Sequence, residues 1–152
     1  MDEKKLMEIA ISLSVESIEK GGGPFGAVIA KDGKIIAKAS NSVTQTNDPT
    51  AHAEINAIRI AAKKLGTYDL SGCQIFSSCE PCPMCLGAIY WARLDKLYFG
   101  SSRKDAMEAG FDDSFIYDEL NLEFTERKIQ TIQIMRSEAI KAFDEWRSEE
   151  HT

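Results

Sequence analysis

The stretch "SSCEPCPMCLGAIYWAR", Ser77 to Arg93, contains three of the chain's four cysteines. It overlaps with "CQIFSSC", residues 73–79, whose apolar character is typical of a short buried strand. A helix is expected to begin near Pro81, because proline fits the first helical turn, and to run to Arg93. Strand and helix together form one β–α unit of the fold. The cysteines stand at equal spacing and form two overlapping C-x-x-C pairs: Cys79, Cys82 and Cys85.

Helices and strands alternate along the rest of the chain, after an initial hairpin. Asp32-Gly33 stands between two apolar runs and favours the type I′ turn of a β-hairpin. The expected elements are helices over residues 3–20, 47–66, 81–93 and 137–150, a hairpin over 25–41, and strands over 73–79, 96–102 and 128–135. This order predicts an α/β fold, a single three-layer α/β/α domain over residues 1–152 with a mixed sheet of roughly five strands.

The helix expected over residues 47–66 has clear signals at both ends. Asp48 can cap its N-terminus, Pro49 suits the first helical position, and Gly66 suits the position just past its end. His52 and Glu54 therefore fall in or near the first turn, where a helix end can approach a neighbouring helix end.

Composition limits the classes of function. The chain has 152 residues and a formal net charge of -6, so a generally basic surface for nucleic acid is not expected. Its N-terminus lacks the apolar core of a signal peptide, and no apolar run is long enough to span a bilayer. We expect a cytoplasmic protein that does not bind a membrane and whose thiols stay reduced. In a reducing compartment, clustered cysteines more often bind metal or take part in catalysis than form disulfides.

One histidine and two cysteines form a candidate metal site. Cys82 and Cys85 lie three residues apart at a helix start, so they share a face, and the positive end of the helix favours their thiolates. His52, near another helix start, supplies a third ligand. Structural zinc sites close with four protein ligands, whereas catalytic sites leave a position for water. Three ligands without a convincing fourth predict a catalytic zinc site, with Glu54 placed to take a proton from water.

Two other interpretations of the cysteines stay open. An iron–sulfur cluster could use C-x-x-C-x-x-C, but the ferredoxin pattern continues to a fourth cysteine, and here "LGAI" follows Cys85. A non-catalytic zinc module or a redox protein would use a closed four-cysteine site or a reversible disulfide. Cys79 distinguishes these interpretations from the catalytic zinc site, because that site needs Cys79 only as a structural residue at a strand end.

His-x-Glu followed by Pro-Cys-x-x-Cys resembles the pattern of zinc-dependent nucleobase deaminases. Four blocks extend the resemblance to bacterial guanine deaminases of the cytidine-deaminase-like superfamily: "GGPFGAVI", "NDPTAHAE", "SCEPCPMCLGAIYWAR" and "AGFDDSFIY". The resemblance implies hydrolysis of a small purine, guanine, to xanthine and ammonia. It also implies a homodimer, in which the C-terminal part is sometimes exchanged between subunits.

The resemblance implies a role for each matching residue. Zinc is held by three ligands: His52, Cys82 and Cys85. Two acids move protons: Glu54 and Asp113. The purine is shaped or contacted by three further side chains: Phe25, Asn41 and Trp91. The end of the chain, "WRSEEHT", is not matched to a site-covering motif, so a contact of His151 with the substrate stays open.

Two other substrates stay open. Adenosine deaminases of transfer RNA share "NDPTAHAE", but they need a positively charged surface for phosphates, and the net charge of -6 argues against one. Another small aminated base or nucleoside, such as cytosine or guanosine, is the second alternative.

Overall fold

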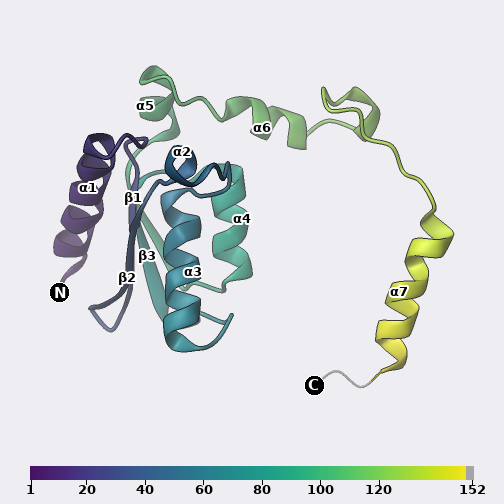
Figure 1. Ribbon diagram of the computed structural model, residues 1–152, viewed down its shortest axis with the longest axis horizontal. Helices are drawn as coiled ribbons and strands as arrows, with labels where there is room; N and C mark the ends of the chain where they lie inside the picture. Colours follow the sequence, from purple (N-terminus) through teal and green to yellow (C-terminus); the bar gives the residue numbers. More distant parts are fainter. Residues whose placement is uncertain (150–152) are drawn as a thin grey trace. The chain divides into compact units, whose positions relative to one another are not determined.

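The computed structural model describes residues 1–149, whose contacts divide into two units (Figure 1). Unit 1 spans Met1–Asp113, and unit 2 begins at Ser114. A single domain over residues 1–152 stays a prediction. Unit 1 contains, in chain order, α1 (Glu3–Glu19), β1 (Gly26–Lys31), β2 (Lys34–Ser40), α2 (Val43–Thr46), α3 (Ala53–Leu65), β3 (Cys73–Cys79), α4 (Pro83–Trp91), β4 (Lys96–Ser101) and α5 (Arg103–Glu108).

The strands of unit 1 form a mixed sheet in the order β2-β1-β3-β4. β1 is antiparallel to both β2 and β3, and β3 is parallel to β4. The predicted hairpin turn is present, since Asp32 and Gly33 both have positive φ, 51° and 73°. The expectation of roughly five strands is wrong, because the sheet has four.

Both faces of this sheet are covered, as Figure 1 shows: α1 lies on one side and α3 and α4 on the other. Side chains of β1 alternate between two apolar clusters. Val28 packs in the cluster under α1, which also contains Leu6 and Phe76. Ile29 packs in the cluster under α3 and α4, which also contains Ile75. The predicted three-layer α/β/α arrangement is therefore present in unit 1.

The helix expected over residues 47–66 begins later than the sequence suggests. α3 starts at Ala53 with His52 as its N-cap, and Gly66 closes it in the left-handed conformation as expected. Asp48 caps a tight turn instead, because its Oδ1 accepts hydrogen bonds from the backbone N–H and the hydroxyl of Thr50. The turn places His52 at the N-terminal end of α3, at the same edge of the sheet as the end of β3.

Unit 2 consists of α6 (Ser114–Leu120), the 3-10 turn η1 (Phe124–Glu126) and α7 (Arg136–Ser148). The final helix is confirmed, but residues 128–135, predicted as a strand, are not assigned to any helix or strand. Within residues 114–149 no residue is buried. No helix in the described chain has both the length and the apolar composition that a membrane span requires.

Candidate metal centre

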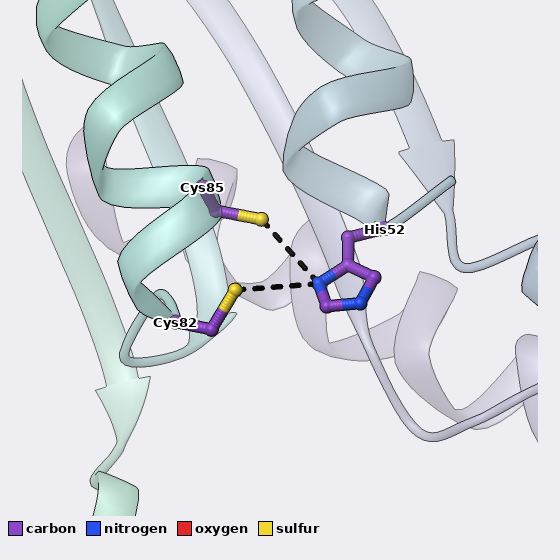
Figure 2. Close-up of side chains that lie close together, drawn as sticks. All are labelled: His52, Cys82 and Cys85. Carbon is purple, nitrogen blue, oxygen red and sulfur yellow. Dashed lines mark hydrogen bonds between the residues drawn. The ribbon is translucent and has the colours of Figure 1, made fainter. Parts of the chain in front are cut away.

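Two helix N-termini bring the predicted ligands together. His52 is the N-cap of α3, and Cys82 is the N-cap of α4, whose first position is Pro83. Cys85 lies three residues further, in the first turn of α4, and is buried. Figure 2 shows the two sulfur atoms and the imidazole pointing toward a common space between the helix ends. Both helices therefore direct their positive ends at the site, where they favour negatively charged ligands.

The spacing of these atoms fits tetrahedral zinc. The Sγ atoms of Cys82 and Cys85 each lie 3.5 Å from Nδ1 of His52, and all three ligand atoms lie within 4.8 Å of one another. Zinc–nitrogen and zinc–sulfur bonds of ordinary length, at a tetrahedral angle, separate nitrogen from sulfur by about 3.6 Å. A single imidazole nitrogen has only one proton or one lone pair to share, so two equal sulfur contacts are better explained by a common ion.

The electrostatics favour thiolate at Cys82. A hydrogen bond from Cys85 and one from His52 lower the pKa of Cys82 to about 4, against the effect of burial. The neighbouring Cys82 sulfur and burial raise the pKa of Cys85, and the hydrogen bond with Cys82 raises the pKa of His52. The Cys82 thiolate thus forms easily, whereas Cys85 needs a cation between the two sulfur atoms before it can lose its proton as well.

Glu54 lies beside this cluster in the first turn of α3. Its side chain is only 6% exposed, and burial raises the pKa of its carboxyl group above the ordinary value. A hydrogen bond with Cys85 acts in the opposite direction. A buried carboxyl group with a raised pKa can exchange protons near neutral pH, as a general acid–base requires.

Asp113 ends unit 1 and is half-buried. Burial raises the pKa of its carboxyl group, and the Cys82 thiolate acts in the same direction. Two residues before Asp113, the ring of Phe111 packs edge-on against the ring of Phe25, with 5.1 Å between the ring centroids. This contact holds the loop that carries Asp113 against the start of β1.

Asn41 directly follows β2 and is hydrogen-bonded to Phe25 and to Val43. Its backbone N–H donates to the carbonyl of Phe25 over 3.2 Å, and its Oδ1 accepts from the N–H of Val43 over 2.8 Å. The next residue, Ser42, donates its backbone N–H to the carbonyl of Ala51, directly before His52. The Asn41 and Phe25 backbones are therefore joined, and Asn41 belongs to a loop bonded to the metal-ligand loop.

Trp91 is not brought to the cluster in the same way. It is the last residue of α4 and is 81% exposed. Six residues separate it from Cys85, which corresponds to about 9 Å along a helix axis. Its contact with a purine stays a prediction, and His151 lies outside the described residues.

Cys79 and Cys73 stand apart from the ligand set. Within residues 1–149, the group of metal-binding side chains that lie close enough to share an ion contains His52, Cys82 and Cys85 and omits Cys79. Cys79 is buried at the end of β3, where its thiol donates to the carbonyl of Ser102 over 3.7 Å. A structural role at the strand end agrees with these contacts.

One residue near the site carried no signal in the sequence. Asn56, in α3, donates from Nδ2 to three oxygen atoms, one at the end of β2 and two in the neighbouring loops. An asparagine in a helix that also contains charged and apolar residues has no distinguishing motif, and only the fold brings these acceptors to it.

Comparison with known proteins agrees with this geometry. Residues 1–101 match the family described as the cytidine and deoxycytidylate deaminase zinc-binding region. Over 149 residues, 97% of this chain and 96% of the relative, the sequence is 52% identical to a guanine deaminase of Bacillus subtilis. A solved structure of guanine deaminase from Bacillus subtilis superposes with a TM-score of 0.96 at 50% identity, covering 100% of this chain and 98% of the other.

More distant relatives are named as enzymes that act on transfer RNA. A tRNA-specific adenosine deaminase of Aquifex aeolicus is 41% identical over 104 residues, which cover 68% of this chain and 69% of the relative. The similarity to the guanine deaminase therefore extends over nearly the whole chain, whereas the similarity to this adenosine deaminase covers about two thirds of it.

Proposed function

Because this chain belongs to the cytidine and deoxycytidylate deaminase zinc-binding family, we propose that it is a zinc-dependent hydrolase that converts guanine and water to xanthine and ammonia. The observation that carries the proposal is the cluster of His52, Cys82 and Cys85 beside the buried carboxyl group of Glu54. Similarity to a guanine deaminase along nearly the whole chain directs the choice of substrate.

His52, Cys82 and Cys85 hold the zinc ion in this proposal. When bound, zinc polarises a water molecule and lowers its pKa to about 7. The donor set supports zinc, because mixed nitrogen and sulfur ligands suit a borderline-soft cation and three protein ligands leave one position open.

Glu54 moves the protons of the reaction. Its carboxylate accepts a proton from the attacking water and donates it to a ring nitrogen of guanine, while the water oxygen bonds to C2. The proton that remains on the added oxygen then passes through Glu54 to the amino group, the C2–N bond breaks, and ammonia leaves. The raised pKa of Glu54 supports this role, because a carboxyl group must both gain and lose a proton within one turnover. We assign Asp113 as a further acid, supported by the raised pKa of its half-buried carboxyl group.

Asn41 and Phe25 bind the purine in this proposal. The Oδ1 atom of Asn41 is engaged by Val43, so Nδ2 is the group left to donate to an acceptor on the base. A Cβ atom on Gly23 would stand 3.1 Å from this Nδ2 and 3.2 Å from the Phe25 ring. Glycine at this position therefore leaves space beside both groups, where a side chain would restrict a flat ligand.

Adenosine in transfer RNA is the alternative substrate, because tRNA-specific adenosine deaminases are about 40% identical to this chain over two thirds of it or more. The net charge of -6 disfavours it, since binding to RNA depends on neutralising phosphates with lysine and arginine.

A substrate panel tests the proposal. Zinc-loaded protein is assayed for ammonia release from guanine, guanosine, cytosine and a transfer RNA, each in parallel. We expect xanthine and ammonia from guanine and little from the others. Deamination of the transfer RNA without deamination of guanine would replace the proposal by its alternative.

We further propose that the protein is a homodimer in which the C-terminal unit is covered by a second copy. Unit 2 exposes large apolar side chains, among them Ile129 at 81%, Ile134 at 77% and Phe143 at 65%. A groove of about 470 Å³ is lined by residues 132–134, Arg136, Ala139, Ile140 and Phe143. Contiguous apolar surface of this kind marks an interaction site. A second copy is the occupant we favour, because α7 is the partner that each such unit can offer in return.

A cytoplasmic location completes the proposal. All four cysteines are free thiols, and two of them must stay reduced to bind zinc. Reducing compartments maintain such thiols.

A further inference from the structure

Asn56 lies in the first turn of α3, beside the end of β2, the loop that follows β2 and the loop that precedes α3. Its Nδ2 donates to the carbonyl of Ser40 over 3.0 Å, to Oγ of Ser42 over 3.0 Å, and to the carbonyl of Ala51 over 3.3 Å. An amide nitrogen has two protons, so three acceptors fully engage it. The side chain is half-buried, and water cannot easily replace all of these contacts.

The acceptors identify what the amide holds in place. Ser40 and Ser42 are the immediate neighbours of Asn41, one on each side, whereas Ala51 directly precedes His52. One side chain on a rigid helix is thus bonded to the Asn41 loop at two points and to the metal-ligand loop at a third. A helix is a better platform for such positioning than either loop.

Asn41 has contacts of its own as well. Its Oδ1 accepts from the N–H of Val43 over 2.8 Å, which orients its side chain within the loop. Its carbonyl accepts from Oγ of Ser17 over 3.5 Å, and its N–H donates to Phe25 over 3.2 Å. His52, by contrast, is fixed independently, because its carbonyl accepts the first helical hydrogen bond of α3 and its N–H donates to Thr50 over 2.8 Å. Loss of the Asn56 amide would therefore release the Asn41 loop more than the metal ligand.

We propose that Asn56 is a positioning residue for the substrate: its amide fixes the loop that carries Asn41 relative to the metal centre and thereby sets the affinity for guanine. This inference rests on the proposed function, since it takes Asn41 to contact the purine. Substitution of Asn56 then raises KM for guanine, while kcat and zinc content change little.

The experiment compares two substitutions of the same chemical kind. Asn56→Leu removes the amide and keeps the branching at Cγ, and Gln74→Leu removes an amide whose Nε2 donates to Gly72 at the opposite end of β3. We expect KM to rise about tenfold in Asn56→Leu, from the loss of two or three hydrogen bonds, and to stay unchanged in Gln74→Leu. Ser42→Ala removes only one acceptor and is expected to raise KM about threefold. It carries the test where Asn56→Leu does not fold.

A double-mutant cycle separates positioning from general stability. In an Asn41→Ala background, Asn56→Leu should raise KM by less than about twofold more, because the group it positions is gone. Equal rises in both backgrounds, or loss of zinc measured by metal analysis, would overturn the inference while guanine deamination by the unmodified protein stands. An unmodified protein inactive on guanine would overturn the proposed function itself. An unchanged KM in Asn41→Ala would contradict the purine contact and, with it, the role of Asn56.

Discussion

Unit 1 and unit 2 use apolar residues in opposite ways. In unit 1, Val28, Ile29, Ile75 and Phe76 are at most 2% exposed and pack on both faces of one sheet. In the described part of unit 2 no residue is buried, although isoleucine and aromatic side chains are frequent there. The first unit therefore contains both halves of its core. The described part of the second contains no such core, which supports the proposal that a second copy of the chain covers it.

The residues proposed for metal binding and proton transfer are also confined to one unit. His52, Glu54, Cys82, Cys85 and Asp113 all belong to unit 1. The helix ends that carry the metal ligands are held by the sheet, so the site has the rigid support that a metal centre needs. Substitutions in unit 1 should therefore affect activity or folding, and substitutions in unit 2 should affect association first.

The largest effect is expected from Glu54→Gln. Removing the proton carrier should lower kcat for guanine by about 10²–10⁴-fold, the usual contribution of general acid–base catalysis, with zinc content and oligomeric state unchanged. Steady-state assay and metal analysis measure both. Glu8→Gln, the same change on the exposed side of α1, is the control and should keep full activity. Normal turnover by Glu54→Gln would remove the chemistry from this residue.

The contrast in packing is tested by Phe76→Ala and Phe143→Ala. Phe76 is 2% exposed and stacks on Tyr98 with 4.6 Å between ring centroids, so its truncation should lower the free energy of unfolding by about 3–5 kcal/mol. Phe143 is 65% exposed, and its truncation should cost within about 0.5 kcal/mol in the monomer. Urea unfolding at a protein concentration below the dimer dissociation constant measures both. Similar losses would mean that unit 2 has a core of its own.

The sequence predicted unit 1 well because its signals are local. The Asp32-Gly33 turn, the Gly66 cap and the His-x-Glu and Pro-Cys-x-x-Cys spacings each depend on neighbouring residues, and the three side chains that gather in the candidate metal centre could be named from them. The start of α3 was misplaced because Asp48 and Pro49 suit both a helix and a tight turn. The hydrogen bonds from Thr50 to Asp48 that close the turn are local, but an Asp48 side chain that caps a helix would use the same oxygen atom, so the sequence permits either.

The fifth strand was wrong for a different reason. Residues 128–135 alternate weakly, as a strand does, but a strand forms only where a partner edge supplies its hydrogen bonds. Asn56 shows the same limit inside unit 1, since its acceptors come from residues 40–51 and no pattern in the helix announces them.

Association is the next test of the comparison. Ile134→Asp places a charge on the exposed apolar surface of unit 2 and should raise the dimer dissociation constant at least about tenfold, equivalent to about 1.4 kcal/mol. Sedimentation velocity over a concentration series measures it. The matched control is Ile11→Asp, on the outer face of α1, where the isoleucine is 45% exposed. A dimer disrupted by the control and not by Ile134→Asp would assign the interface to unit 1.

The smallest effect concerns pH and is confined to unit 1, which holds every cysteine of the chain. Cys73 is fully buried at the start of β3, and burial raises the pKa of its thiol. The folded chain therefore keeps this thiol neutral at a pH where the unfolded chain, with a thiol pKa of about 8.5, releases the proton. Stability is thus complete below that pH and declines as the pH rises toward the folded pKa, by at most about 1.4 kcal/mol per pH unit.

Cys73→Val removes this contribution and keeps an apolar side chain of similar size. Urea unfolding at pH 8 and pH 9.5 should show a smaller alkaline loss of stability in Cys73→Val than in the unmodified chain. Cys79 is present in both proteins, so its own raised pKa cancels in the difference. Equal losses in the two proteins would mean that the Cys73 thiol ionises as easily inside the sheet as in the unfolded chain, and that the core of unit 1 admits water at this strand end.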